Sequence, residues 1–401
     1  MRKGLRFGAI GAMFMFMTMV FAMPMSADET TKDWTVLVYL DGDNSLEYYV
    51  DVNINWIEEY GSDDNVNFVA LVDRLSGPAD LIYITEGVGT SISVGADYGF
   101  PKEVNMADPS VLADFIERGV KDFPAEKYAL DIWDHGGGWR GICWDDTTYE
   151  ETGVDDCITM VELREALADA YETTGVVLDA VAFDACLMAM PEVAYQCRDY
   201  ADYLAFSEET VPGFGFPYMT IAEDLTGEPT MDAEEFVVMI AEDYGEYYSS
   251  ISGYVDVTMS AMDMTYMDDL TAAVDYLGAE LLESLSTYMN VYQAAMIQAD
   301  RYYYPYNVDL KGFAQNLVSS AIIKDDGIKE AANDVVMAVN DAVIIAVNSI
   351  HNVDSTGIAI YFPSTNDGMH SIKVDYVDVP FATETSWYDF CYAFSNWEGR
   401  A

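Results

Sequence analysis

Basic side chains are scarce in this sequence, which has 18 Lys and Arg against 70 Asp and Glu and a formal net charge of −52 at pH 7. Such a protein repels phosphate-rich surfaces, which excludes nucleic acids and anionic membranes as natural partners. The charge indicates instead a well-solvated acidic exterior, adaptation to high salt, or attraction of basic substrates. The amino-acid composition alone does not distinguish these three interpretations of the acidic charge.

Apolar runs long enough to cross a membrane are absent. The longest, Phe7–Phe21, falls short of the roughly 20 residues that a spanning helix needs. Three basic residues precede this run, and small residues follow it at Ala22 and Ala27. The pattern predicts a signal peptide over residues 1–27 and a secreted protein with no membrane contact after signal removal, the alternative being a retained anchor.

Cysteine is uncommon, and its count of five is odd. At least one thiol therefore stays unpaired in an exported chain, whatever disulfides form. Cys143, Cys157, Cys197 and Cys391 could form up to two bridges or be buried as small apolar side chains. The fifth cysteine, Cys186, has a different sequence context and is a candidate for chemistry.

The first half of the chain alternates β-rich runs with amphipathic helical segments such as Ser110–Val120 and Met160–Tyr171. This alternation predicts an α/β fold with a mostly parallel sheet sandwiched by helices. The predicted strands are Trp34–Leu40, Val66–Val72, Tyr128–Trp133, Leu178–Phe183 and Tyr203–Ser207.

The second half is mainly helical, with helices predicted over Glu234–Tyr248, Met267–Tyr292 and Lys329–Ile350. One late strand is predicted over Gly357–Phe362. The change near residue 225 predicts an α/β core over residues 28–225 and a helical C-terminal subdomain over residues 226–401 that returns the strand 357–362 to the core.

In parallel α/β sheets, ligands bind beyond the carboxyl ends of the strands, so the residues after each strand are the candidates for a site. After the strand that ends at Trp133 comes Asp134-His135-Gly136-Gly137-Gly138. The glycines let the backbone turn sharply and approach a ligand closely. His135, one of three histidines, is therefore a functional candidate, whereas most lone histidines are structural.

After the next predicted strand comes Phe183-Asp184-Ala185-Cys186, followed by a helix that Pro191 can start. A thiol near a helix N-terminus is expected to favour its thiolate form. The alternative for Cys186 is a buried core cysteine. The acidic residue Asp184, two positions earlier, disfavours this alternative. A third loop, Ser207–Tyr218, is rich in Pro, Gly and aromatic residues and is either a pocket wall or an ordinary loop.

Together these segments resemble the clostripain family of cysteine peptidases, relatives of caspases, gingipains and legumains. The resemblance begins at the turn Asp41-Gly42-Asp43-Asn44-Ser45, continues through the His135 and Cys186 motifs, and includes the Pro-Gly-x-Gly loop and a late Gly-Ile-Ala-Ile-Tyr-Phe-Pro strand. It spans roughly residues 33–395. It implies a caspase-like fold and a cysteine endopeptidase with no required cofactor, acting on peptide or protein substrates.

By this resemblance, the Cys186 thiolate attacks the scissile carbonyl and His135 protonates the departing amine. The backbone N–H groups of Gly136 and Cys186 would form the oxyanion hole. Asp184 matches an acid that relatives use to bind Arg or Lys before the cleaved bond. A second such acid is replaced here by Phe214, which offers a cation–π contact in its place, so an apolar or mixed preference is the alternative.

The resemblance also implies two features of activation. Relatives often cleave themselves at a basic residue after the His motif. Between Gly141 and Leu163 this sequence has no Lys or Arg, so no such self-cleavage is expected in this loop. Some members need calcium, for which the acid pairs Asp145-Asp146 and Asp155-Asp156 could supply oxygen ligands.

Two other functions compete with a peptidase. A His-Gly-Gly-Gly motif also builds oxyanion holes in lipases, but that fold needs a Gly-x-Ser-x-Gly elbow, which this chain lacks. A catalytically silent, acidic, secreted binding module could also keep the fold. The presence of both His135 and Cys186 favours the peptidase.

Overall fold

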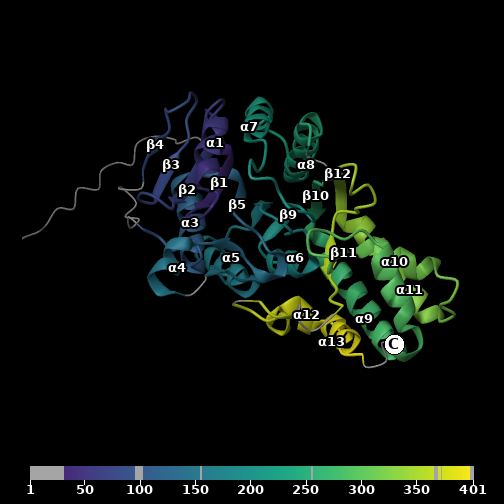
Figure 1. Ribbon diagram of the computed structural model, residues 1–401. Helices are drawn as coiled ribbons and strands as arrows, with labels where there is room; N and C mark the ends of the chain where they lie inside the picture. Colours follow the sequence, from purple (N-terminus) through teal and green to yellow (C-terminus); the bar gives the residue numbers. More distant parts are fainter. Residues whose placement is uncertain are drawn as a thin grey trace, which may run out of the picture. The chain divides into compact units, whose positions relative to one another are not determined.

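A nine-stranded sheet organises the chain from Lys32 onward (Figure 1). The structure is a computed structural model that describes residues 31–94, 103–153, 156–253, 256–364, 369–371 and 373–397. The predicted signal peptide, residues 1–27, lies outside the described residues. Among the helices of these ranges, none combines the length and apolar character that a membrane span requires.

The centre of the sheet is parallel, in the order β9-β8-β5-β1-β2. These strands confirm the five predicted ones within a few residues: β1 Lys32–Gly42, β2 Val66–Arg74, β5 Ala125–Trp133, β8 Leu178–Asp184 and β9 Ala201–Phe206. They are apolar almost throughout because both faces of the sheet are covered. The predicted α/β class is confirmed.

Antiparallel strands extend the sheet at both edges. On the β2 side these are β3 (Asp80–Tyr83) and β4 (Ile92–Ser93), and on the β9 side β10 (Thr258–Asp263) and β12 (Val343–Asn348). A small hairpin of β6 (Ile142–Trp144) and β7 (Cys157–Ile158) lies apart from the sheet.

Helices cover the two faces of the sheet, and alternating side chains of β1 show how. Leu37 and Tyr39 belong to one buried apolar cluster, whereas Val36 and Val38 belong to another on the opposite face. The first cluster includes helices α3 (Pro109–Asp122), α5 (Met160–Thr174), α6 (Pro191–Cys197) and α9 (Met267–Gln298); the second includes α1 (Glu47–Ile57), α7 (Tyr218–Gly227) and α8 (Ala233–Ser250).

The predicted helix Lys329–Ile350 is wrong in its second half. Helix α11 runs over Asp326–Ala342, and the chain then enters β12, which pairs antiparallel with β10. Residues 343–347 contain four β-branched side chains, which favour a strand where a sheet edge is available. The second half of the chain therefore contributes two strands to the central sheet.

The late strand predicted over Gly357–Phe362 is shorter, β13 at Ala359–Tyr361, and it pairs with β11 (Asn307–Asp309) in a separate two-stranded sheet rather than in the central one. Its Ala359 N–H donates to the Ala189 carbonyl at 2.8 Å. The remaining helices are α4 (Asp146–Thr152), α10 (Leu310–Ser319), α12 (Pro380–Glu384) and α13 (Trp387–Ser395). The unit that begins at Lys32 continues past residue 225 without a division.

Candidate active site

His135 lies two residues beyond the end of β5. Its Nε2 is 2.9 Å from the Oγ of Ser45, which follows β1, the neighbouring strand. Burial lowers the pKa of the imidazole, and the charge of Asp146 opposes this effect. The imidazole is therefore neutral at neutral pH and able to accept a proton. Within the described residues no carboxylate accepts a hydrogen bond from it.

Cys186 lies two residues beyond β8, the other neighbour of β5. Its thiol is half-buried, and the Val211 N–H donates to Sγ at 3.3 Å. The next residue, Leu187, has a φ of +66°, in the left-handed region that non-glycine residues seldom adopt. A strained turn thus presents the thiol at the end of the strand.

The imidazole and the thiol border one cavity of about 230 Å³, which Asp184 also lines. Parallel strands β5 and β8 are adjacent, so the residues that follow them meet at the same edge of the sheet. The structure therefore brings together His135, Cys186 and Asp184, which lie up to 51 positions apart in the sequence.

Gly136 allows the two loops to approach each other. A Cβ at this position would lie 2.3 Å from the Cys186 carbonyl oxygen and 2.9 Å from its nitrogen, distances that no side chain tolerates. The Gly136 N–H hydrogen-bonds the Cys186 thiol. The Cys186 N–H makes no hydrogen bond with any part of the chain that the structure describes. Both predicted oxyanion-hole donors thus lie beside the sulfur.

Asp184 is buried, and its two carboxylate oxygens differ. Oδ2 accepts hydrogen bonds from the Phe216 N–H at 2.7 Å and the Tyr218 hydroxyl at 2.9 Å. Oδ1 is buried and has no hydrogen-bond partner within the described residues. Gly215, with a φ of +66°, passes so close that a Cβ would lie 2.3 Å from Oδ2. The carboxylate therefore keeps one acceptor unused beside the cavity.

A second buried acid, Asp131, supports Asp184 from behind. The Tyr218 hydroxyl contacts both carboxylates, and its one proton serves only one of them at a time. Burial, then the charge of Asp131, raises the pKa of Asp184 well above its usual range. The protonated form of the Asp184 carboxyl is therefore favoured by its surroundings.

Phe214 does not line this cavity. Its ring stacks on Trp56 with centroids 6.0 Å apart and meets the edge of Tyr49 at 5.3 Å, both on α1. The Asn53 amide also donates to the Phe214 carbonyl at 2.9 Å. The predicted cation–π contact with substrate is therefore not supported, because α1 already covers the ring.

In a comparison with known protein families, the model of the Clostripain family matches residues 38–397. The chain belongs to the clostripain family. Clostripain from Hathewaya histolytica is 27% identical over 88% of this chain and 79% of its own. A secreted C11 cysteine protease from Bacteroides thetaiotaomicron, solved with an irreversible peptide inhibitor, is 22% identical with a TM-score of 0.64, covering 90% of this chain and 99% of that chain.

An inactive zymogen C11 protease from Parabacteroides distasonis is also similar, with 24% identity and a TM-score of 0.63 over 91% of this chain and 99% of that chain. These structures confirm the fold. Membership of the clostripain family makes this chain a cysteine protease.

The pKa of the Cys186 thiol is shifted in the direction opposite to the favoured thiolate that the sequence led us to expect. Burial raises the pKa of Cys186, although hydrogen bonds from Val211 and Gly136 oppose this effect. Helix α6 begins only at Pro191 and has seven residues, so its positive end acts weakly on the sulfur. The direction of these shifts favours the protonated thiol of Cys186 beside an imidazole whose pKa burial lowers.

The other four cysteines are free thiols buried in the protein. Cys197, on α6, and Cys391, on α13, lie within the largest apolar cluster. Of the two possibilities that the sequence left open, the structure has the buried small side chains and no disulfide. Cys186 is the most exposed thiol of the five.

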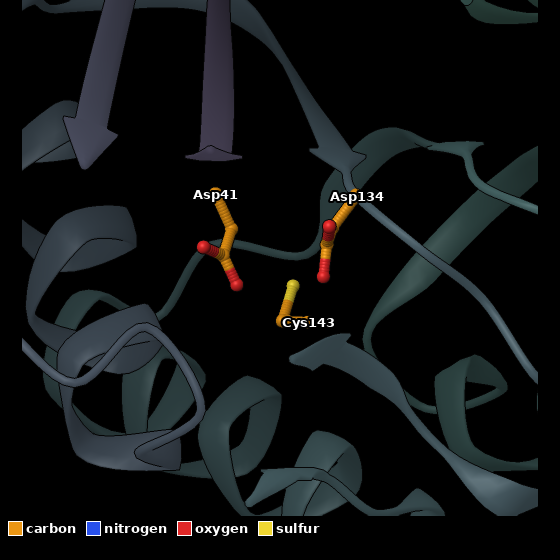
Figure 2. Close-up of side chains that lie close together, drawn as sticks. All are labelled: Asp41, Asp134 and Cys143. Carbon is orange, nitrogen blue, oxygen red and sulfur yellow. The ribbon is translucent and has the colours of Figure 1, made fainter. Parts of the chain in front are cut away.

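Buried acids gather behind the site, at the ends of β1, β2 and β5. Asp41, Asp134 and Cys143 point toward one another (Figure 2), with ligand atoms within 4.8 Å. Asp43, Asp73 and Asp145 form a second group of the same size. No Lys or Arg of the described residues forms an ion pair with these acids. Such groups are stable only if carboxyls retain protons or a cation is bound.

The two acid pairs considered for calcium, Asp145-Asp146 and Asp155-Asp156, have different surroundings in the structure. Asp156 pairs with Lys373 at 2.6 Å, and Asp155 lies outside the described residues. Asp145 belongs to the all-carboxylate group with Asp43 and Asp73, in which Oδ2 of Asp73 is buried without a hydrogen-bond partner. Carboxylate oxygens are the ligands that calcium prefers, so this group fits the ion better than the pair with Lys373 does.

Two buried carboxyls, Asp131 and Glu192, are expected to make the protein more stable at mildly acidic pH than at neutral pH. Burial raises the pKa of Asp131 and of Glu192, each to about 7. In the unfolded chain both lose their protons near pH 4, so between pH 5 and 7 the unfolded state binds fewer protons than the folded state. The free energy of unfolding is then expected to fall by about 1.4 kcal/mol per pH unit for each such group as pH rises.

Thermal melts at pH 5, 6 and 7 at constant ionic strength measure this effect. Glu192→Gln keeps the side-chain size, and a Gln oxygen can still accept from the Tyr361 N–H. The variant is expected to show a shallower pH dependence than the wild type. A melting temperature that rises from pH 5 to pH 7 would contradict the assignment.

Sequence reasoning missed three parts of the site: Ser45 beside the imidazole, the Val211 N–H on the sulfur, and the Tyr218–Asp131 pair behind Asp184. Ser45 lies in the turn Asp41–Ser45, which contributes to the family resemblance, so the sequence did indicate that this turn lies near the site. The other two contacts join residues from distant loops and have no local signature.

Proposed function

We propose that this chain is a secreted endopeptidase that cleaves peptide bonds after Arg or Lys, with Cys186 as nucleophile and His135 as general base and acid. The proposal depends on one observation: a single cavity of about 230 Å³ is lined by the thiol, the imidazole and a buried carboxylate. Export is proposed from the signal-like segment over residues 1–27.

In the first step, His135 removes the thiol proton as sulfur attacks the scissile carbonyl carbon. This order suits a resting pair of thiol and neutral imidazole, since burial raises the pKa of Cys186 and lowers that of His135. The C–N bond then breaks, and His135 gives the proton to the departing amine. Water hydrolyses the thioester and restores the thiol.

Charge develops on the carbonyl oxygen during attack. The Gly136 and Cys186 N–H groups are the proposed donors, because Gly136 lies against the Cys186 backbone and the Cys186 N–H has no other partner in the described residues. A single donor of this kind typically contributes about 3–4 kcal/mol to transition-state stabilisation. Ser45 would hold the imidazole through Nε2 while Nδ1 exchanges the proton.

Specificity is proposed to come from Asp184. Its Oδ1 has no partner, is buried beside the cavity, and is suited to accept a guanidinium or an ammonium group. A basic side chain that enters would displace the proton that burial and Asp131 favour on this carboxyl. An apolar side chain would leave the carboxyl without a partner, which disfavours it.

Calcium, which the resemblance implies for some members of the family, would be held by Asp43, Asp73 and Asp145. The ion would neutralise carboxylates at the ends of the strands that carry the site. The proposed peptide cleavage uses only His135, Cys186 and backbone N–H groups.

A fluorogenic peptide panel that varies only the residue before the cut tests the specificity. Arg and Lys peptides are expected to exceed Leu and Asp peptides in kcat/KM by on the order of 10²-fold, because only the cations fill the unused acceptor of Asp184. Highest activity on the Leu peptide would refute basic specificity while leaving the peptidase assignment intact.

A further inference from the structure

We infer that Asp41, Asp134 and Cys143 form a binding site for a thiophilic divalent cation such as Zn²⁺, behind the cavity that contains His135 and Cys186. A carboxylate oxygen of each aspartate and the thiolate sulfur would be the ligands. This site is distinct from the all-carboxylate group proposed above for calcium. It goes beyond the proposed peptidase function and does not depend on it.

The three side chains come from segments that converge on one point. Asp41 lies near the end of β1, Asp134 follows β5 directly, and Cys143 lies on β6 of the small hairpin. Figure 2 shows the side chains pointing toward one another, and their ligand atoms all lie within 4.8 Å of each other. Atoms that bond one Zn²⁺ at about 2.0–2.3 Å lie within about 4.6 Å of each other, so small side-chain shifts suffice.

An unused oxygen of Asp41 points to a ligand at this place. The residue is fully buried, and its Oδ2 has no hydrogen-bond partner within the described residues. Its Oδ1 accepts a hydrogen bond from the Asp43 N–H at 3.2 Å. Among the ion pairs of the described residues, none includes Asp41 or Asp134. A buried carboxylate without a partner is costly, and a cation between these side chains would satisfy it.

The Asp134 carboxylate is held in a fixed orientation by its neighbours. Its Oδ1 accepts a hydrogen bond from the Asn44 amide at 2.6 Å, and its Oδ2 accepts one from the Trp144 N–H at 2.5 Å. A carboxylate oxygen has a further lone pair, so it can bind a cation while it accepts a hydrogen bond. Supporting hydrogen bonds of this kind are typical of metal ligands because they orient the ligand.

Cys143 decides which cation fits the site. The residue is fully buried and has a φ of +59°, a left-handed conformation that is uncommon outside glycine. Its N–H donates to the His135 carbonyl at 3.3 Å, which joins β6 to the loop after β5. Thiolate ligands favour Zn²⁺ and softer cations, whereas calcium takes oxygen ligands. The two groups of buried acids therefore differ in the ion that they prefer.

Asp134 also lines the cavity of about 230 Å³ that contains His135 and Cys186. A cation can therefore reach the site from this cavity. Three protein ligands leave the fourth position of a tetrahedral Zn²⁺ for a water molecule. The bound ion would join the ends of β1 and β5 to β6 and so stabilise the loop that carries His135.

Titration of the metal-free protein with Cd²⁺, a probe for Zn²⁺ sites, tests this inference by ultraviolet absorption. The full chain carries Cys186→Ala, which removes the thiol of the cavity, and excess Ca²⁺ occupies oxygen-only sites. About one Cd²⁺ per chain is expected to give a thiolate-to-metal charge-transfer band, which Zn²⁺ should abolish by displacement. Absence of the band, or its suppression by Ca²⁺, would overturn the inference.

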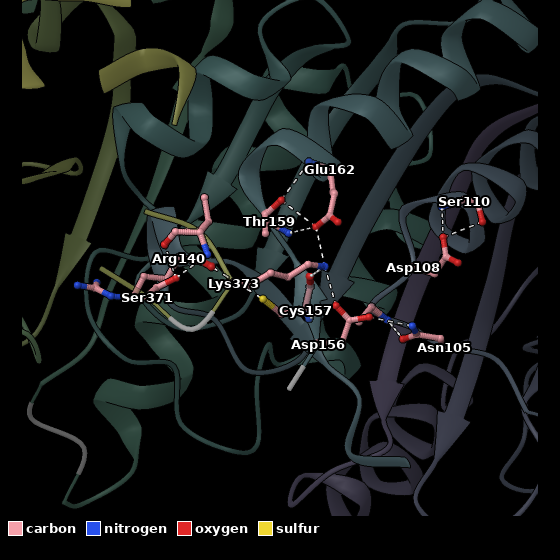
Figure 3. A network of polar contacts seen from close by, with 12 residues as sticks. Asn105, Asp108, Ser110, Arg140, Asp156, Cys157, Thr159, Glu162, Ser371 and Lys373 are labelled. Carbon is pink, nitrogen blue, oxygen red and sulfur yellow. Dashed lines mark hydrogen bonds and ion pairs between the residues drawn. The ribbon is translucent and has the colours of Figure 1, made fainter. Parts of the chain in front are cut away.

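Cys143→Ser, made in the same Cys186→Ala chain, removes the sulfur ligand. The band should disappear, and Zn²⁺ affinity should fall by more than about 100-fold, because changes around a ligand alone typically cost about 10–100-fold. The matched control is Cys157→Ser on β7. The Cys157 thiol contacts the Arg140 carbonyl at 3.9 Å, and the Cys157 carbonyl accepts from Lys373 at 2.7 Å, in a separate network (Figure 3). A band that survives in Cys143→Ser, or disappears in Cys157→Ser, would contradict ligation by Cys143.

Asp41→Asn provides a variant that is expected to stay folded, because it removes a buried charge and still accepts from the Asp43 N–H. Zn²⁺ affinity should fall at least about tenfold. Zn²⁺ should raise the melting temperature of the Cys186→Ala chain, and raise it much less when Asp41→Asn is added. Equal Zn²⁺ affinity with and without Asp41→Asn would exclude this carboxylate as a ligand and overturn the site.

Discussion

Replacing Cys186 with alanine is expected to lower kcat/KM for an arginyl peptide by about 10⁴-fold or more while the protein stays folded. Among the described residues that line the cavity with His135, Cys186 alone carries a nucleophilic thiol or hydroxyl, so the proposed acyl-enzyme is not expected to form without it. The side chain is half-buried, and its loss leaves two donors, the Val211 and Gly136 N–H groups, without their sulfur acceptor, so the melting temperature should change little.

A matched control is Cys197→Ala, since Cys197 is fully buried on α6 and does not line the cavity that contains Cys186. This variant loses some packing but should keep wild-type kcat/KM. His135→Ala is expected to lower activity on the order of 10³-fold, because the thiol then lacks both its base and the acid for the leaving amine. Cys186→Ala retaining more than a few per cent of wild-type activity would contradict the proposed chemistry.

Replacing Asp184 with asparagine is expected to remove the preference for basic residues. The change keeps the shape and an acceptor for the Phe216 N–H, but leaves the substrate cation unpaired in a buried cavity. Losing the partner of a buried charge typically costs about 3–5 kcal/mol, which corresponds to a roughly 10²- to 4 × 10³-fold lower kcat/KM for Arg peptides. Leu peptides should be affected much less.

The Arg-to-Leu ratio on one preparation is the appropriate measurement, because any loss of folded protein cancels. In the wild type this ratio should rise with pH as Asp184 loses its proton, since burial and Asp131 raise the pKa of this carboxyl. In Asp184→Asn the ratio should be low and flat with pH. A variant that keeps the wild-type ratio would show that Asp184 does not bind the substrate.

The central strands were predictable because they are buried on both faces. A mostly apolar run such as Val66–Val72 is typical of a strand that is buried on both faces. The strand β2 begins at the predicted residue. The boundary between α11 and β12 was not predictable, because Val343 to Val347 continue an apolar pattern that suits either structure. What selects the strand is pairing with β10, about 85 positions earlier in the sequence.

The candidate site was also predictable from the sequence only in part. Residues after strands β5 and β8 were identifiable because parallel topology places them at one edge of the sheet. The orientation of Phe214 was not, since it depends on Tyr49 and Trp56 of α1. The ionisation of Cys186 depends on burial, which the local sequence does not reveal.

The most direct test of the Cys186 assignment is alkylation of the intact chain with iodoacetamide, followed by peptide mapping and an activity assay on the same samples. The other four thiols are buried, so label should appear on Cys186 first, with activity lost in proportion. Peptidase activity that persists with Cys186 fully alkylated would contradict the assignment.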